Sequence, residues 1–256
     1  MPHIYCGDPN EDFSLALCEE LVNAGADMLE LGIPFSDPIA DGPTLTLACE
    51  RALQGGTTPR SCLALISGIK ERVGVPVIVN SYYNILYTMG LREAVRKVKE
   101  CGADGLLVPD APLEEAGELL RLSREEGIDL ILQVAPTTSD ERLGRIVSHA
   151  SGFLYVINFE GVTGVRDEPL KGTIELLRRV RTRTSLPLMA GFGISKPEQA
   201  RLLVEKGADG VVVGSAIAEI YSQHLDRPER ALPRISLFVR QMKQACVEGY
   251  RRRRHS

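Results

Sequence analysis

The chain has 256 residues, of which 44% are hydrophobic and 25% charged, and its formal net charge is −4. This size fits one large α/β domain, and the slight acidic excess argues against a general nucleic-acid-binding protein. Six cysteines and four histidines are scattered without metal-ligand spacing, so the sequence predicts reduced thiols and no metal site. Because it shows neither a secretory signal nor an apolar run of about 20 residues, we expect a cytoplasmic protein outside the membrane.

Short segments rich in Val, Ile and Leu recur along the chain and predict parallel strands that are covered on both sides. In chain order these segments lie at residues 3–7, 27–32, 75–80, 104–109, 129–135, 152–158, 186–191 and 210–214. Between them lie segments with apolar residues at helical spacing, such as 13–22, 114–124 and 174–180. Eight strands alternating with helices favour a single (β/α)8 TIM barrel over residues 1–250, with an open doubly wound sheet as the alternative.

The tripeptide Gly-Ala-Asp is an internal repeat that begins at Gly25, Gly102 and Gly207, with a looser copy at Gly127. Each copy follows a helical pattern and precedes an apolar run. Glycine can end a helix in the left-handed conformation, after which a short polar residue turns the chain into a strand. The copies therefore predict one helix-to-strand joint built several times. The basic run at residues 251–256 is expected to be a solvated C-terminal tail, with a binding patch as the less favoured alternative.

Glu30 lies inside the apolar second strand, Leu29-Glu30-Leu31-Gly32. Polar residues near the C-terminal ends of barrel strands are commonly catalytic. A carboxylate that faces the core loses hydration, which favours its protonated form and suits it to proton transfer near neutral pH. Taken alone, however, Glu30 is better explained as the ion-pair partner of a basic residue at the barrel rim.

The loop after this strand strengthens the catalytic interpretation. It carries Asp37 and Asp41 among prolines and glycines, and such a stiff loop can hold a second carboxylate over the barrel mouth. Either aspartate alone is also typical of a simple turn. Glu30 with a loop aspartate supplies an acid–base group and an anionic hydrogen-bond acceptor, a combination that requires no metal.

Two glycine loops follow the last two predicted strands. Gly191-Phe192-Gly193 comes after the seventh strand, and Gly214-Ser215 comes after the eighth and opens a helix. Glycines let backbone N–H groups approach a phosphate, and a helix N-terminus adds its positive dipole end. One such loop alone is usually a turn, whereas the pair at these places favours phosphate binding. Residues 161–164 form a third glycine loop, suited to a lid or a backbone donor.

Together these segments resemble the tryptophan synthase alpha subunit family. The resemblance runs from Gly7-Asp8-Pro9 to about Ala218, and its most specific stretch is LELGIPFSDPIADGP at residues 29–43. The supporting segments are Tyr82-Tyr83-Asn84, Asp110-Ala111-Pro112, Ala135-Pro136-Thr137-Thr138, Gly161 to Gly164, Gly191 to Ser195, and Gly214-Ser215.

The resemblance implies a lyase of tryptophan biosynthesis that cleaves indole-3-glycerol phosphate by a retro-aldol reaction. The products would be indole and glyceraldehyde 3-phosphate, and no cofactor would be needed. Glu30 would be the acid and base at indole C3 and the glycerol hydroxyl, and Asp41 would accept the indole N–H. The implied substrate-binding residues are Tyr155, Leu107, Phe192, Tyr82 and Thr163, and the implied phosphate-binding residues are Gly164, Gly193, Gly214 and Ser215.

The resemblance also implies a partner, the pyridoxal-phosphate beta subunit of an α2β2 complex, docked near Asp37 and Pro38. It implies neither a nucleic-acid partner nor a membrane. Two alternatives stay open. One is a free-standing indole-releasing lyase, and the other is a catalytically weak alpha-like paralogue that acts as a regulatory binding subunit.

Three features depart from the family pattern. Members usually have a helix before the first strand, whereas this sequence starts at the strand, so we expect a barrel without that helix. His3, Asn80 and Gln133 stand where the family favours apolar or aromatic residues. We expect these three to border the indole and to satisfy one another or a water. Residues 158–160, Asn-Phe-Glu, are unusual as well.

Overall fold

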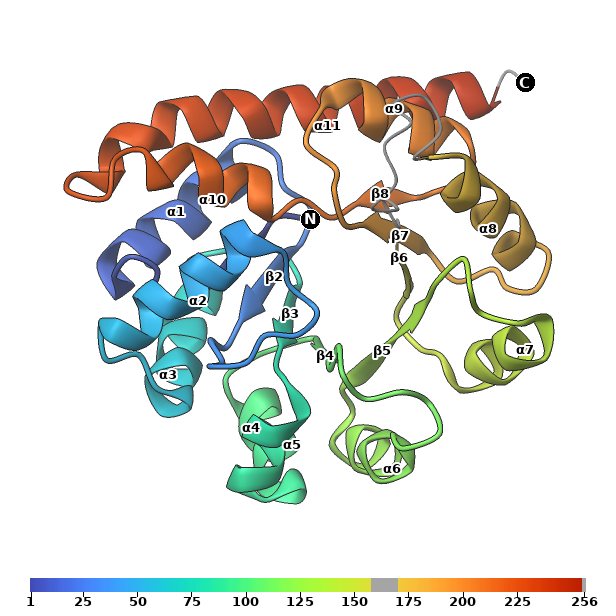
Figure 1. Ribbon diagram of the computed structural model, residues 1–256, viewed down its shortest axis with the longest axis horizontal. Coiled ribbons are helices and arrows are strands. Elements are labelled where there is room, and N and C mark those ends of the chain that lie inside the picture. Colours follow the sequence, from blue (N-terminus) through green and yellow to red (C-terminus); the bar gives the residue numbers. More distant parts are fainter. Residues whose placement is uncertain (158–169, 255–256) are drawn as a thin grey trace. The chain divides into compact units, whose positions relative to one another are not determined.

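The computed structural model describes residues 1–157 and 170–254 (Figure 1). By its internal contacts the chain divides into two compact units. Unit 1 comprises Met1–Leu130 and Gly214–Val239, and unit 2 comprises Ile131–Val213 and Arg240–Ser256. A strand is present at each of the eight predicted positions, and each strand is shorter than predicted.

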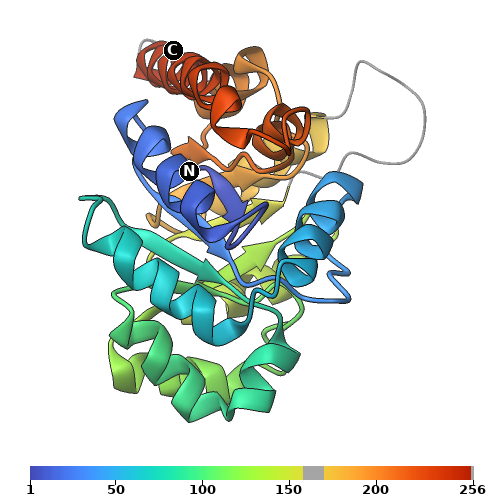
Figure 2. The same ribbon diagram turned by 90° about the vertical axis from the view of Figure 1, so that its left-hand side faces the viewer.

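Unit 1 begins with four parallel strands that pair in sequence order. They are β1 (His3–Tyr5), β2 (Leu29–Gly32), β3 (Val77–Asn80) and β4 (Gly105–Leu107). The helices are α1 (Glu11–Asn23), α2 (Pro43–Gln54), α3 (Pro59–Lys70), α4 (Tyr83–Met89), α5 (Leu91–Glu100), α6 (Gly117–Glu126), α10 (Ser215–Ser222), the 3-10 helix η1 (Pro228–Ala231) and the first part of α11 (Leu232–Arg254). Helix α1 packs against α3, and α5 packs against α4 and α6 (Figure 2). Helices α2 and α10 contact each other and β1.

Unit 2 repeats the strand–helix alternation. Its strands are β5 (Asp129–Val134), β6 (Leu154–Ile157), β7 (Leu188–Gly191) and β8 (Gly210–Val211), which again pair in parallel and in sequence order. Its helices are α7 (Asp140–His149), α8 (Lys171–Arg181), α9 (Pro197–Glu205) and the last part of α11. Among the described residues of both units, no helix is long and apolar enough to cross a bilayer.

The helix starts follow from local capping. Asn10 accepts a hydrogen bond from the Phe13 N–H at the start of α1. Thr58 caps α3 and forms a capping box with Ser61, and Ser139 caps α7. Each of these side chains satisfies an N–H that has no partner within its helix.

The predicted helix-to-strand joint is confirmed. The four glycines that mark it have φ between +64° and +123°, the left-handed region that glycine tolerates: Gly25, Gly102, Gly127 and Gly207. In the second copy, Asp104 Oδ2 accepts hydrogen bonds from the Val77 N–H at 2.8 Å and from Lys70 Nζ at 2.9 Å. Lys70 Nζ also donates to the Val75 carbonyl at 3.2 Å. One carboxylate therefore ties a helix end to the start of a strand.

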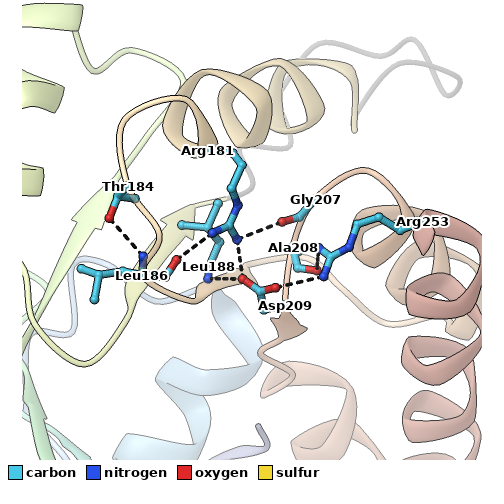
Figure 3. A network of polar contacts seen from close by, with 8 residues as sticks. All are labelled: Arg181, Thr184, Leu186, Leu188, Gly207, Ala208, Asp209 and Arg253. Atoms are coloured by element: carbon cyan, nitrogen blue, oxygen red, sulfur yellow. Dashed lines mark hydrogen bonds and ion pairs between the residues drawn. The ribbon is translucent and has the colours of Figure 1, made fainter. Parts of the chain in front are cut away.

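The Asp209 joint in unit 2 repeats this arrangement (Figure 3). In both joints the basic side chain donates to a carbonyl five residues further along the chain. Asp209 Oδ2 accepts from the Leu188 N–H at 2.9 Å and from Arg181 Nη2, and Arg181 Nη1 donates to the Leu186 carbonyl at 3.0 Å. Arg253 adds a second cation, whose Nη2 lies 3.1 Å from Asp209 Oδ1. The repeat in the sequence is thus a repeat of one polar network.

The C-terminal basic run differs from its predicted form. Residues 251–254, expected as part of a solvated tail, are the last turn of α11. Arg253 donates to the Ala208 carbonyl at 3.0 Å as well as to Asp209. Cations near a helix C-terminus are favoured by the helix dipole, and here one of them also has a carboxylate partner. The run of four arginines in the sequence gives no sign that one of them has a carboxylate partner.

A buried ion pair fixes α2 and α10 beside β1. Asp8 is 1% exposed and accepts hydrogen bonds from Arg51 of α2 through both oxygens, each at 2.8 Å. Tyr221 of α10 donates to the same carboxylate at 2.5 Å. A buried carboxylate requires such partners, because an unpaired buried charge is strongly destabilising. The cluster therefore ties the last turn of α10 to the segment that follows β1.

Candidate active site

Glu30 is buried in β2, with 2% of its surface exposed. The strand register places His3 of β1 opposite Glu30 and Asn80 of β3 opposite Gly32. Glu30 Oε1 lies 3.0 Å from His3 Nδ1 and accepts a 2.7 Å hydrogen bond from Asn80 Nδ2. The other oxygen, Oε2, is buried and has no hydrogen-bond partner within the described residues. The predicted basic partner at the barrel rim is therefore replaced by a histidine and an amide, and one oxygen stays open.

His3 is held closely by its surroundings. It is 5% exposed, and the Tyr5 ring meets its imidazole edge-on with centroids 5.0 Å apart. A Cβ added at Gly214 would lie 3.0 Å from His3 Cδ2, and one added at Gly32 would lie 3.1 Å from His3 Cε1. A side chain at either position would press against the imidazole, and one at Gly32 would also lie 2.6 Å from the Tyr5 ring. Gly32 and Gly214 thus let the imidazole reach Glu30.

Asp41 is anchored by two phenols. Tyr5 and Tyr82 donate hydrogen bonds to Asp41 Oδ2 at 2.6 and 2.8 Å. Tyr82 Oη also accepts from the Ala40 N–H at 3.1 Å, which fixes the loop that carries Asp41. Burial raises the pKa of both phenols, and the charge of Asp41 raises it further. The two hydroxyls therefore stay protonated and donate.

The two predicted catalytic carboxylates belong to one connected cluster in unit 1. Tyr5 joins them, since its ring contacts His3 beside Glu30 while its hydroxyl binds Asp41. Tyr5 was missed in the sequence analysis. Its signal was the alternation of β1, because residues two apart in a strand share a face and Tyr5 stands two residues after His3.

Other predicted residues of unit 1 are also placed. Leu107 in β4 is 1% exposed and lies opposite Asn80 in the strand register. Gly214 is the N-cap of α10, and Ser215 is its first residue. The backbone N–H groups at this helix start are the feature on which the predicted phosphate site depends.

In unit 2, the structure brings together the two predicted aromatic residues. The rings of Tyr155 in β6 and Phe192 after β7 meet edge-on with centroids 6.2 Å apart. Phe192 has a φ of +73°, which is uncommon for a residue with a side chain, and Gly193 follows it. Gln133 in β5 is half-buried and lies opposite Tyr155 in the register.

We expected His3, Asn80 and Gln133 to form hydrogen bonds with one another or with a water. For His3 and Asn80 this expectation is corrected. Both make their contacts with Glu30. The physical reason is that a buried carboxylate is a stronger acceptor than a neutral amide or imidazole. Two predicted residues, Thr163 and Gly164, lie outside the described residues, as do residues 158–160.

A repeated parallel β/α architecture with these two carboxylates defines a class of protein. Among the described residues, one buried oxygen of Glu30 has no hydrogen-bond partner, and the Asp41 carboxylate is held by two phenols. The class is that of β/α enzymes that use carboxylates for acid–base chemistry.

Comparison with known proteins narrows this class. The family model described as tryptophan synthase alpha chain matches residues 1–247. The tryptophan synthase alpha chain of Methanothermobacter thermautotrophicus is 46% identical over 97% of this chain and 92% of its own length. That of Carboxydothermus hydrogenoformans is 44% identical over 93% and 90%. The solved structure of the Pyrococcus furiosus tryptophan synthase α-subunit superposes with a TM-score of 0.87, at 35% identity over 95% of this chain and 96% of that one.

The chain therefore belongs to the tryptophan synthase alpha chain family. Its fold is the (β/α)8 TIM barrel of that family, which confirms the predicted fold class over the open sheet. Its activity is the lyase reaction of the family, cleavage of indole-3-glycerol phosphate in tryptophan biosynthesis. The limits of the barrel at residues 1 and 250 stay a prediction.

Proposed function

We propose that Glu30 carries the proton in both halves of this cleavage. As an acid it gives a proton to C3 of the indole, and the indole nitrogen becomes positively charged. As a base it then takes the proton of the glycerol hydroxyl that neighbours the ring. The carbon–carbon bond breaks, its electron pair returns to the indole, and the aldehyde forms. The observation that carries this role is the buried Oε2, which has no hydrogen-bond partner among residues 1–157 and 170–254.

Asp41 is the proposed acceptor of the indole N–H. Its negative charge stabilises the cation that forms when C3 is protonated. The two phenols on Oδ2 hold the carboxylate in one orientation without neutralising it, because neither donor carries a positive charge. A cationic partner in their place would oppose the same step.

Phosphate binding is proposed at the start of α10, through the backbone N–H groups of Gly214 and Ser215. The eight-residue helix contributes its positive dipole end there. The remaining residues implied by the resemblance stay predictions. They are Gly164 and Gly193 for phosphate, and Tyr155, Leu107, Phe192, Tyr82 and Thr163 for the indole ring.

A beta subunit is the proposed partner, and the cytoplasm the proposed location. A similar solved structure, 36% identical with a TM-score of 0.87, is described as part of the tryptophan synthase α2β2 complex of Pyrococcus furiosus. In this chain the loop around Asp37 presents Ile39 with 82% of its surface exposed. An exposed large apolar side chain is a feature of docking surfaces.

The test is indole release from indole-3-glycerol phosphate by the purified chain, with and without a tryptophan synthase beta subunit. We expect release by the chain alone and faster release with the partner. Release that the partner leaves unchanged supports the free-standing lyase. Binding of the partner without release in either case supports the regulatory paralogue and contradicts the role of Glu30.

A further inference from the structure

The two oxygens of Glu30 have different surroundings. Oε1 contacts His3 at 3.0 Å and Asn80 at 2.7 Å, while Oε2 is buried with no protein partner in the described part of the chain. A carboxylate held through one oxygen cannot rotate freely, so the open oxygen keeps a fixed direction. Oε1 therefore holds the side chain in place, and Oε2 is the oxygen that can react.

His3 is itself held on several sides. The Tyr5 ring meets the imidazole edge-on, and Gly32 and Gly214 lie close against it. Both ring nitrogens are buried without a formal hydrogen bond among the described residues, and Nδ1 lies at ion-pair distance, 3.0 Å, from Glu30 Oε1. Within the described part of the chain, the ring therefore has Glu30 as its charged neighbour, and Nε2 has no acceptor.

The charges around His3 favour its protonated form. Burial alone lowers its pKa, but the charge and contact of Glu30, with a smaller contribution from Asp41, outweigh burial and the pKa is raised. Tyr5 and Tyr82, the other titratable groups of this cluster, have phenol pKa values raised by burial and stay neutral. Asn80 and the glycine at the start of α10 add no charge.

We propose that His3 is a positioning residue for Glu30, and that with Asn80 it holds Oε1 while keeping one proton shared within the histidine–glutamate pair. This inference rests on the proposed acid–base role of Glu30. In the acid form of the pair this proton lies on Oε2, from which it passes to C3 of the indole, while neutral His3 keeps its contact with Oε1. The pair then holds one proton fewer, and it regains one from the glycerol hydroxyl as the carbon–carbon bond breaks. Protons and charge balance over the cycle.

The proposal predicts where activity is lost at high pH. With His3 present, the pair keeps its proton until the imidazolium titrates, above the ordinary range of histidine. Without His3, Glu30 must hold the proton alone, because the variant has no imidazole to share it. The alkaline limb of the rate profile therefore lies at lower pH in a variant that lacks the imidazole.

The experiment is a single-turnover measurement of cleavage from about pH 5 to 9 in the wild type and in His3→Gln. We expect the alkaline limb of the variant to move down by about one pH unit or more, equal to a tenfold or greater loss on that limb. Asn80→Leu is expected to lower the rate without moving the limb, because His3 still titrates. The exposed His149→Gln is the control and should match the wild type. Superimposed profiles for wild type and His3→Gln overturn the proposal.

A second measurement does not depend on turnover. Nitrogen NMR of the labelled imidazole reports the titration of His3 in the wild type and in Glu30→Gln. We expect a raised pKa in the wild type that falls when the carboxylate is removed. A His3 that is already neutral near pH 6, or one whose titration ignores the Glu30 change, contradicts the shared proton. An inactive chain with the expected titration overturns the proposed function and leaves the pair supported.

Discussion

Glu30 in unit 1 and Asp209 in unit 2 are both carboxylates at the strands, yet their partners differ in kind. Asp209 has a strand N–H and two arginines as partners, so both oxygens face fixed donors (Figure 3). Glu30 has a titratable imidazole and a neutral amide on one oxygen and an open second oxygen. The difference agrees with the proposal that Asp209 stabilises the fold and that Glu30 exchanges protons with the substrate.

Asp104 shows that the contacts of Asp209 belong to the repeated Gly-Ala-Asp joint. Asp104 also accepts a hydrogen bond from a strand N–H, and its cationic partner is a lysine where Asp209 has an arginine. Both aspartates precede a strand, whereas Glu30 lies within one and Asp41 follows it. In a β/α protein of this family the chemistry is expected at the C-terminal ends of the strands and stability at the other ends. The partners of each carboxylate agree with that division.

Apart from Glu30 itself, the largest effect on turnover is expected at Asp41. Asp41→Asn should lower turnover about ten- to a hundredfold, because an amide does not stabilise the developing cation as a carboxylate does. The Tyr5 and Tyr82 hydrogen bonds can persist to the amide oxygen, so the melting temperature should change little. Steady-state kinetics would show the loss in kcat. A change confined to KM would make Asp41 a ground-state binding residue only.

A stability effect is expected instead at Asp209. Asp209→Asn removes the negative charge that faces two arginines, and its side chain is 33% exposed. Allowing for that exposure, we expect a loss of about 1–2 kcal/mol in the free energy of unfolding and unchanged turnover. Asp104→Asn is the matched variant. With one lysine and a side chain 49% exposed, it should lose less. Equal losses in urea unfolding would show that the second cation contributes nothing.

The Asp209 contribution should also depend on pH. Burial alone raises the pKa of Asp209, but hydrogen bonds from the Leu188 N–H and from Arg253 and Arg181 outweigh it, and the pKa is lowered. The stabilisation is therefore fully present above the unfolded pKa and is lost as the pH falls through the folded one. The stabilities of wild type and Asp209→Asn should converge as the pH falls below the ordinary pKa of an aspartate. A difference that stays constant through that acid range contradicts the charged role.

The smallest effect is expected at the end of α11. Arg253→Met keeps most of the side-chain bulk but loses the contacts with Asp209 and Ala208. Partly exposed ion pairs contribute about 1 kcal/mol or less, so we expect a small fall in melting temperature and normal turnover. Arg251→Met is the control at an exposed position in the same turn. If the two variants behave alike, the Arg253 contact adds no stability.

Local patterns were sufficient to predict the strands, the joints and the buried Glu30. Each depends on residues close in sequence, such as the Gly-Ala-Asp tripeptides and the apolar run around Glu30. The fold class followed because the same joint recurs. The family resemblance added the roles of Glu30 and Asp41, which the structure places in one cluster.

The partners of these residues could not be predicted in the same way. The contact of His3 with Glu30 depends on the register between β1 and β2 and on two glycines distant in sequence, Gly32 and Gly214. Tyr5 reaches Asp41 across 36 residues. Arg253 reaches Asp209 from a helix whose end looked like a solvated tail. Such contacts are set by tertiary packing, which composition and periodicity do not encode.

The most direct test of the division between the two kinds of carboxylate compares Glu30→Gln with Asp209→Asn in one experiment. Single-turnover cleavage and thermal unfolding are measured for both variants and the wild type. We predict that Glu30→Gln slows cleavage by about a hundredfold or more with an unchanged melting temperature. Asp209→Asn should melt earlier and cleave at the wild-type rate. Near-normal cleavage by Glu30→Gln, with its loss appearing in stability instead, would contradict the account.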